Sequence, residues 1–252
     1  MPIAADIYFF TNQEEEKLPV ILLHGAGGSH LSWPAEVRRL PGFSVYALDL
    51  PGHGKSSGRG HQSIPSYTRS IVAWLDAMSI RRAVFVGHSM GSAIVQQLAV
   101  DYPPVVAGIG LIGSATRLSV NPVLIQESAN ETTYFNAVEK IVSWSFSANM
   151  PENLKALVAK RMAETRPSVL NGDLLACDRF DLAECLSQIN CPTLLLYGDQ
   201  DKMTPVREAY SLAALIPNAK LELVPEAGHM VMLEKPEAVA SSLLRFLREI
   251  PF

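Results

Sequence analysis

Residues 84–92 read Val-Phe-Val-Gly-His-Ser-Met-Gly-Ser, and this stretch decides the fold class. It joins a short apolar run, Ala83 to Gly87, to the pattern Gly-x-Ser-x-Gly, which is centred on Ser89. Apolar side chains at helical spacing follow between Ser92 and Asp101. The stretch therefore predicts a buried strand, a sharp turn at Ser89 and a helix that begins directly after the turn.

Ser89 has a structural and a catalytic interpretation. A serine between a strand and a helix often caps the helix, and glycines are common in such turns. In a nucleophile elbow the same turn strains the serine backbone and exposes its hydroxyl, while Gly87 and Gly91 leave room for the neighbouring strand and helix. Because an apolar strand and a helix flank the pentapeptide, we favour the catalytic interpretation, in which the Ser89 hydroxyl needs a base to take its proton.

The base is expected among the six histidines of the chain. His229 follows the last predicted strand and precedes the last predicted helix. Loops that follow strand C-termini gather at one edge of a parallel sheet, where ligands bind. His229 is therefore the predicted base, whereas His88 must point away from Ser89 if the sharp turn forms.

The acid that orients the base is expected in the loop after the preceding strand. Two aspartates, Asp199 and Asp201, lie in this loop. Asp199 can stabilise the turn by bonding to its own backbone, a common role of aspartate in loops. Asp201 lies further along and is our choice, with the role of fixing the tautomer of His229 and stabilising its imidazolium. The resulting order Ser, Asp, His along the chain is typical of one large class of serine hydrolases.

An oxyanion hole requires two preorganised backbone donors. The N–H of Met90, directly after the predicted nucleophile, is the first candidate. The second is the N–H of Ala26 in the glycine-rich loop His24–Ser29. This loop has the alternative interpretation of a simple connection between strand and helix. It is not a phosphate loop, because the Gly-Lys-Ser/Thr ending is missing.

Short apolar runs alternate with segments of helical period along most of the chain. Runs with little polar alternation are typical of strands buried on both faces of a parallel sheet. The alternation predicts an α/β fold with a mostly parallel, doubly wound sheet and helices on both faces. Further strands are expected at residues 18–23, 43–50, 106–112, 193–197 and 221–224, and further helices at residues 66–78, 206–216 and 236–248.

Residues 116–189 lack a convincing strand but contain several helical stretches. We expect an α/β core made of residues 1–115 and 190–252, with residues 116–189 as an inserted helical cap. The insert either covers the edge of the sheet or closes a pocket. In the second case its large apolar side chains favour an uncharged, hydrophobic substrate group. The side chains expected to line the pocket are Trp144, Phe146, Met150 and Met230.

Size and composition exclude several classes of protein. The 252 residues can bury one large core, and 48% hydrophobic with 18% charged residues is typical of an ordered globular protein. A formal net charge of −4 and scattered basic residues argue against a nucleic-acid partner. No segment approaches the roughly 20 apolar residues of a membrane span, and residues 1–16 do not resemble a signal peptide. The three cysteines form no Cys-x-x-Cys pair, so a reduced, cytoplasmic protein is expected.

The sequence predicts neither a metal centre nor another cofactor. It has no His-x-x-x-His pair, and no cysteine cluster completes a zinc site. Asp173, Asp178 and Asp181 lie close together in the sequence, so a cation site is one interpretation of them. Because calcium-loop spacing is missing, we favour a solvated charged surface for these three residues.

Four stretches together resemble the α/β-hydrolase superfamily over nearly the whole chain. They are His24–Gly28, Asp49–Ser56, Gly87–Gly91, and Gly198–Pro205 together with Gly228-His229. The resemblance implies an eight-stranded, mostly parallel sheet with a helical cap inserted after the sixth strand. It also supports Asp201 over Asp199 as the acid.

Three positions narrow this resemblance. Ser89 stands where haloalkane dehalogenases and epoxide hydrolases carry aspartate. Tyr134 is the one tyrosine of the expected cap, where epoxide hydrolases use a pair, and Met230 stands where carbon–carbon bond hydrolases carry tryptophan. The chain therefore resembles carboxylesterases, with lactonases, thioesterases and pimeloyl-ester hydrolases as neighbours.

The leading expectation is a serine hydrolase that cleaves small-to-medium carboxylic esters through an acyl-enzyme on Ser89. The alternative is a ligand-binding receptor or signalling protein of the same fold with little turnover. Among enzymes, a lactonase or a thioesterase is the alternative. A small-molecule ester is the expected partner, and the sequence leaves open whether the chain is a monomer or a homo-oligomer.

Overall fold

The computed structural model describes residues 2–12 and 18–251. Residues 1 and 13–16, which belong to the N-terminal segment considered above for a targeting signal, lie outside these ranges, as do residues 17 and 252. The described chain folds around an eight-stranded sheet. Its strands are β1 (Ile3–Ala4), β2 (Ile7–Thr11), β3 (Pro19–Leu23), β4 (Ser44–Leu48), β5 (Ala83–His88), β6 (Val106–Ile112), β7 (Thr193–Gly198) and β8 (Ala219–Val224).

The strands are ordered β1-β2-β4-β3-β5-β6-β7-β8 across the sheet. β1 and β2 pair antiparallel with their neighbours, and the strands from β4 to β8 pair in parallel. The prediction of an eight-stranded, mostly parallel sheet is therefore confirmed. The six strands expected from apolar runs are all present. The two additional strands lack such a run, because β1 has two residues and β2 alternates buried and partly exposed side chains.

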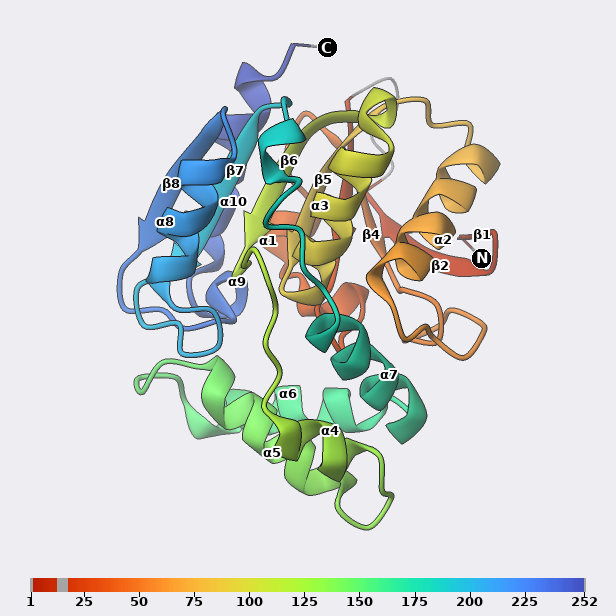
Figure 1. The fold of residues 1–252 in the computed structure, drawn as a ribbon, viewed down its shortest axis with the longest axis vertical. Coiled ribbons are helices and arrows are strands. Elements are labelled where there is room, and N and C mark those ends of the chain that lie inside the picture. Colours follow the sequence, from red (N-terminus) through yellow and green to blue (C-terminus); the bar gives the residue numbers. More distant parts are fainter. Residues whose placement is uncertain (1, 13–17, 252) are drawn as a thin grey trace.

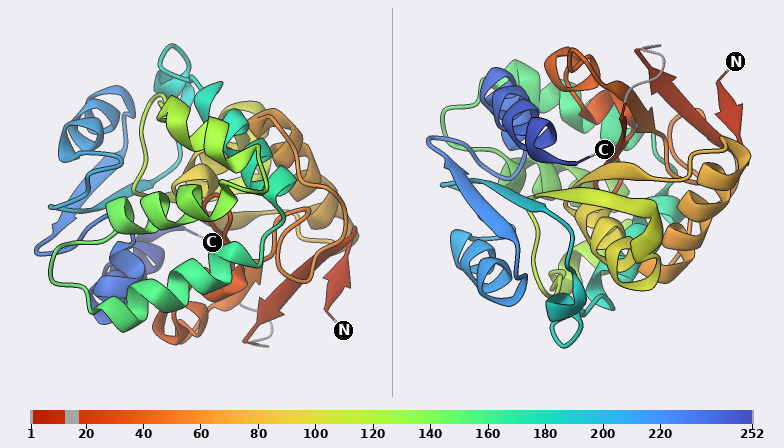
Figure 2. Two further views of the ribbon diagram at one scale, coloured as in Figure 1. Left: turned by 90° about the horizontal axis from the view of Figure 1, so that it is seen from below. Right: turned by 90° about the horizontal axis from the view of Figure 1, so that it is seen from above.

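Helices cover both faces of the sheet (Figures 1 and 2). Successive side chains of a strand point to opposite faces, and because the strands are apolar on both, each face needs a covering layer. In β3, Ile21 and Leu23 join the hydrophobic cluster on one face, whereas Val20 and Leu22 join the cluster on the other. The doubly wound arrangement is confirmed. On the first face lie α2 (Ile64–Ala77), α3 (Met90–Asp101) and α8 (Val206–Leu215), and on the second lie α1 (Ala35–Arg38), α9 (Val231–Glu234) and α10 (Pro236–Glu249).

Four helices follow β6, the sixth strand, and form a layer beyond one end of the sheet (Figure 1). They have a small hydrophobic cluster of their own, which includes Leu124, Tyr134 and Leu170. This agrees with the helical insert that the resemblance implied, while its boundaries at residues 116 and 189 remain a prediction. The layer consists of α4 (Pro122–Ser128), α5 (Tyr134–Ser145), α6 (Glu152–Ala163) and α7 (Pro167–Asp178).

Short 3₁₀ helices complete the described chain, and they are η1 (His30–Ser32), η2 (Pro103–Val105) and η3 (Leu186–Gln188). None of the helices within residues 2–12 and 18–251 combines the length and the apolar character needed to cross a membrane.

Candidate active site

Ser89 lies in the tight turn between β5 and α3. Its backbone has φ 52° and ψ −117°, and such a conformation costs a residue other than glycine roughly 1–3 kcal/mol. Neighbouring glycines make the turn feasible. A Cβ at Gly87 would lie 2.2 Å from the carbonyl oxygen of Gly91, and a Cβ at Gly91 would lie 2.1 Å from the carbonyl oxygen of Leu23. The turn therefore has the strained geometry predicted from the sequence.

The Ser89 side chain does not cap the helix that it precedes. Within the described chain it makes no capping hydrogen bond to α3. The Ser92 hydroxyl instead donates to the Ser89 carbonyl oxygen at 2.5 Å, and Ser89 lines a cavity. The strained backbone of Ser89 is therefore not explained by capping of α3. Strained residues are often found at active sites, so its place at a cavity supports the catalytic interpretation.

His229 and Asp201 form a buried pair. His229 Nδ1 lies 2.8 Å from Asp201 Oδ2, and the two residues are 2% and 6% exposed. Asp201 Oδ1 accepts hydrogen bonds of 2.8 Å from the N–H groups of Met203 and Thr204, and the Thr204 hydroxyl donates to Oδ2. Burial alone would raise the pKa of Asp201, but His229 and these donors outweigh it and hold the pKa below its usual value.

The second ring nitrogen of His229 is free to act as an acceptor. Because Nδ1 donates to Asp201, the proton of the neutral ring lies on Nδ1, and Nε2 carries a lone pair. Nε2 is buried and has no hydrogen-bond partner among the residues that the structure describes. Ser89 and His229 line the same cavity. The structure thus brings all three predicted residues to the carboxyl ends of the parallel strands. His229 is hydrogen-bonded to Asp201, and in the described ranges no hydrogen bond joins Ser89 to His229.

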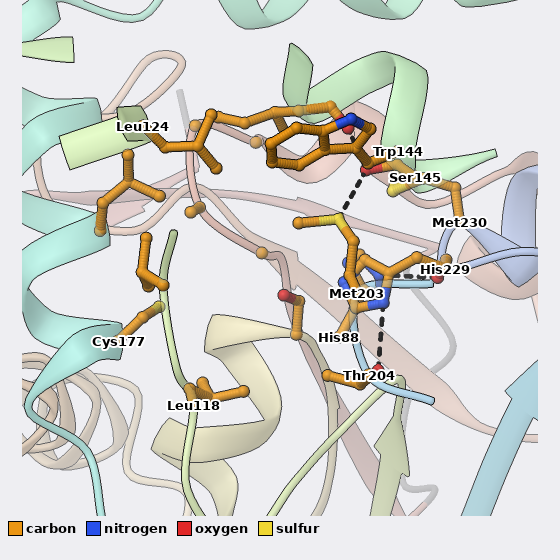
Figure 3. A pocket seen from close by; sticks show the side chains of 18 of the residues that line it. His88, Leu118, Leu124, Trp144, Ser145, Cys177, Met203, Thr204, His229 and Met230 are labelled. Atoms are coloured by element: carbon orange, nitrogen blue, oxygen red, sulfur yellow. Dashed lines mark hydrogen bonds between the residues drawn. The ribbon is translucent and has the colours of Figure 1, made fainter. Parts of the chain in front are cut away.

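Two residues that sequence reasoning did not assign hold the His229 ring in place. The His88 ring lies 4.7 Å from the His229 ring, and His88 Nε2 donates to the His229 carbonyl oxygen at 3.0 Å (Figure 3). Burial, reinforced by His229, lowers the pKa of His88 to about 3, so His88 stays neutral. Gly113 has φ 55°, and a Cβ there would lie 2.9 Å from the His229 ring. In the sequence, the only signal of the contact between Gly113 and His229 was a glycine at the end of a buried strand.

The Ala26 N–H is oriented by the peptide group to which it belongs. The carbonyl oxygen of this group, on Gly25, accepts hydrogen bonds from His24 Nδ1 at 2.8 Å and from the Gly28 N–H at 3.1 Å. In a trans peptide the N–H points opposite to the carbonyl, so the Ala26 N–H is turned away from His24. As the first residue of α3, Met90 has an N–H without an acceptor inside its helix. Both donors remain predictions as an oxyanion hole, and this geometry supports them.

A second buried cluster of charged residues lies beside the glycine loop. Asp173 on α7 is 0% exposed, so a solvated surface was the wrong interpretation for this residue. It pairs with His53 Nε2 at 2.7 Å, and Asp49 pairs with His30 Nδ1 at 2.8 Å. Within the described ranges no group of three or more His, Cys, Asp or Glu side chains has the arrangement of a metal site.

The cavity at Ser89 has a volume of about 620 Å³ and lies between the sheet edge and the helical layer. Trp144 and Met230, both expected to face a pocket, line it. Leu118, Leu124 and Cys177 lie across the cavity from His229 (Figure 3). Exposed charged side chains stand around it, and these are Arg117, Arg161, Lys202 and Arg207.

Two of the expected pocket residues do not belong to the cavity wall as the structure describes it. Phe146 is 2% exposed and packs with Val142 and Val231 on the sheet side. The helix α5 ends at Ser145, and the next residue, Phe146, has an extended backbone with φ −111° and ψ 152°. Trp144, in the last turn of α5, lines the cavity, whereas Phe146, beyond the helix end, packs in the core. Met150 packs against the same core cluster.

Comparison with known proteins gives consistent findings. A family model described as the alpha/beta hydrolase fold matches residues 19–236. Protein ABHD8 from Bos taurus is 30% identical over 249 residues, which cover 90% of this chain and 55% of ABHD8, so the chain spans about half the length of that relative. The pimeloyl-[acyl-carrier protein] methyl ester esterase of Pectobacterium atrosepticum is 27% identical, over 90% of this chain and 93% of the esterase.

A solved structure of a thermophilic esterase is 31% identical and covers 96% of this chain and 93% of its own. The two folds superimpose with a TM-score of 0.83. Because the family model spans all the parallel strands, together with Ser89, Asp201 and His229, it includes every element described above as the candidate site. The chain belongs to the alpha/beta hydrolase fold family.

Proposed function

We propose that the protein hydrolyses carboxylic esters through an acyl-enzyme on Ser89. The observation that carries the proposal is the state of His229, whose Nδ1 is bound to a buried carboxylate while its buried Nε2 has no partner in the described residues. A neutral imidazole held in this tautomer is a base for the hydroxyl of a serine at the same cavity. The strained turn places Ser89 at this cavity without giving α3 a side-chain cap.

In the first step His229 Nε2 takes the proton of Ser89 Oγ while Oγ forms a bond to the ester carbonyl carbon. The carbonyl oxygen becomes an oxyanion, which the N–H groups of Ala26 and Met90 would stabilise. Asp201 stabilises the imidazolium without taking its proton. When the oxyanion collapses, the bond to the alkoxy oxygen breaks and His229 gives its proton to the departing alcohol.

In the second step His229 takes a proton from water, and the water oxygen attacks the acyl carbon on Ser89 Oγ. Collapse of the second oxyanion releases the carboxylic acid, and the proton returns through His229 to the serine. The two steps together consume an ester and water and yield an acid and an alcohol. No group outside the described site is needed for this balance.

The cavity favours an ester with an uncharged, hydrophobic portion. Leu118, Leu124 and Cys177 form an apolar wall across from His229, with Trp144 beside it. A volume of about 620 Å³ is in the range of pockets for small molecules. The relatives named above as esterases support the same substrate class. A series of p-nitrophenyl esters, with lactones and acyl thioesters added, would identify the preferred acyl group and leaving group.

The nucleophile is tested by labelling and by turnover. A fluorophosphonate probe should bond to Ser89 Oγ of the wild-type protein with loss of fluoride, and Ser89→Ala should lose both the label and the hydrolysis of p-nitrophenyl esters. Ser119→Ala is the matched control, because Ser119 is an exposed serine at the same cavity. A Ser89→Ala variant that hydrolyses esters at the wild-type rate contradicts the proposal.

The same assay separates an enzyme from a ligand receptor of this fold. An enzyme releases many equivalents of p-nitrophenol per protein, because the acyl group leaves Ser89 in the second step. A receptor with an acylable serine releases about one equivalent and then stops. Turnover limited to this single burst would contradict the hydrolase proposal and favour a receptor.

A further inference from the structure

Asp173 is a fully buried carboxylate that binds three segments of the core from the helical layer. Its Oδ2 accepts the Gly27 N–H at 2.9 Å and faces His53 Nε2 at 2.7 Å, and its Oδ1 accepts the Tyr67 hydroxyl at 2.5 Å. Gly27 follows β3, His53 follows β4 and Tyr67 lies on α2, whereas Asp173 lies on α7. One side chain of α7 therefore fixes the position of that helix against three parts of the core.

The groups around Asp173 hold it as a hydrogen-bond acceptor. His53 has an acceptor at each ring nitrogen, the Pro51 carbonyl oxygen at 3.1 Å from Nδ1 and Asp173 at Nε2. Both nitrogens therefore carry protons. Burial lowers the pKa of His53, but Asp173 and the Pro51 carbonyl outweigh it, so the pKa is raised. Burial and the charge of Asp173 raise the pKa of Tyr67, which remains a phenol and donates its proton to the carboxylate.

The Gly27 peptide groups are held by the helical layer on both sides. The Gly27 N–H binds Asp173, and the Gly27 carbonyl oxygen accepts the Thr165 hydroxyl at 3.1 Å. Gly27 has φ 64°, and a Cβ there would lie 3.0 Å from Leu170 Cδ1. A larger residue at this position would be strained by the positive φ and would require Leu170 to shift.

The adjacent peptide group contains the Ala26 N–H, and the core holds it from the other side. His24 Nδ1 donates to the Gly25 carbonyl oxygen, and His24 Nε2 accepts the Leu50 N–H at 3.0 Å. Burial, reinforced by His53, lowers the pKa of His24 to about 4, which keeps the ring neutral and this pattern of donors intact. Ala26 therefore lies between a peptide group fixed by His24 and one fixed by Asp173, and Thr165 holds the next peptide group along the chain.

We propose that Asp173 is a positioning residue for the oxyanion loop, and that the contact of α7 with Gly27 aims the Ala26 N–H at the developing oxyanion. The inference depends on the hydrolase function proposed above. In this proposal the helical layer forms a wall of the cavity and also helps to stabilise the transition state. Loss of the contact should affect the transition state more than substrate binding, because a neutral ester carbonyl gains less from the donor than an oxyanion does.

The test compares Asp173→Ala and Thr165→Val with wild type at a temperature where circular dichroism shows all three folded. We expect Asp173→Ala to lower kcat for p-nitrophenyl acetate by about 10- to 100-fold, with KM changed less than about threefold. Thr165→Val leaves the buried ion pair intact and should lower kcat in the same direction, by about threefold to tenfold. Asp178→Ala is the matched control on the same helix, because Asp178 is exposed and does not contact Gly27.

A transition-state analogue separates positioning from a merely structural role. A trifluoromethyl ketone forms a bond between its carbonyl carbon and Ser89 Oγ, and the resulting oxyanion occupies the oxyanion hole. Its inhibition constant should rise in each variant by the factor by which kcat/KM falls. Variants that are less stable but retain wild-type kcat and ketone affinity would overturn the inference.

The two proposals fail in different ways. If the wild-type protein neither turns over esters nor binds the ketone, the hydrolase proposal fails. If wild type does both and the folded Asp173→Ala and Thr165→Val variants match it, only the role of Asp173 is contradicted. Should Asp173→Ala not fold, Thr165→Val decides the matter alone.

Discussion

Two histidines of this protein pair with buried aspartates at nearly equal distances and differ at their second ring nitrogen. His229 Nδ1 lies 2.8 Å from Asp201, and His53 Nε2 lies 2.7 Å from Asp173. His53 Nδ1 also has an acceptor, the Pro51 carbonyl oxygen, whereas His229 Nε2 has no partner within the described chain. A ring with two bound nitrogens holds two segments together. A ring with one free nitrogen at a cavity can transfer a proton.

A buried His–Asp pair therefore does not identify a catalytic site by itself. What matters is whether the second ring nitrogen has a partner and whether the histidine lines a cavity. His229 lines the cavity, and His53 is not among the described residues that line it. The four predictions below test this difference, beginning with the largest expected effect.

His229→Ala should lower kcat by about 10⁴- to 10⁶-fold, because Ser89 then has no base. Steady-state hydrolysis of p-nitrophenyl acetate measures the loss, and fluorophosphonate labelling of Ser89 should slow in parallel. Circular dichroism provides the control for folding. A folded variant whose kcat stays within tenfold of wild type would remove the distinction between the two pairs.

Asp201→Asn should lower kcat by about 10⁴-fold, because an amide can donate to Nδ1 and favour the wrong tautomer of His229. The matched control is Asp199→Asn, which changes the exposed aspartate of the same loop and should remain near the wild-type rate. Equal losses in the two variants, or a larger loss for Asp199→Asn, would show that Asp201 is not the acid.

His53→Leu should destabilise the protein by about 3–5 kcal/mol, because it leaves Asp173 as a buried charge without its cationic partner. Urea unfolding monitored by tryptophan fluorescence gives the free energy. His229→Ala should cost less, because Asp201 keeps three hydrogen bonds, from Met203 and Thr204, whereas Asp173 keeps two, from Gly27 and Tyr67. If the His229 variant is the less stable of the two, His53 does not have the greater structural role.

The neutral histidine beside His229 should make the fold sensitive to acid. The pKa of His88 is about 3 in the folded protein, against about 6.5 in an unfolded chain. Between these values the unfolded state binds the additional proton, so stability falls as the pH drops below about 6.5 and levels off near pH 3. His88→Gln keeps a donor for the His229 carbonyl and removes the titration. For each pH unit below about 6.5, the folding equilibrium constant of wild type should fall by up to about tenfold more than that of the variant. Parallel pH profiles for the two proteins would rule out this role of His88.

The sequence was sufficient to predict those elements whose pattern lies within one continuous segment. The buried parallel strands read as apolar runs, the helices on the sheet faces read as amphipathic periods, and the turn at Ser89 reads as a strained elbow between glycines. β1 and β2 were missed because a short antiparallel pair at the sheet edge needs no continuous apolar run. Phe146 was misplaced because a list of large apolar residues does not say on which side of a helix end each one lies.

By itself, the sequence predicted the order of the strands β3 to β8 and of the helices α2, α3, α8 and α10. It also proposed Ser89, Asp201 and His229 as the site, because each lies in a loop next to a strand whose pattern is local. The tertiary structure alone decided which partners the histidines find. His53 and Asp173 are 120 positions apart, and no periodicity of either segment encodes that contact. Burial made Asp173, one of three aspartates close together in the sequence, a charge that must be paired. Packing left Nε2 of His229, a residue that lines the cavity, without a partner in the described residues.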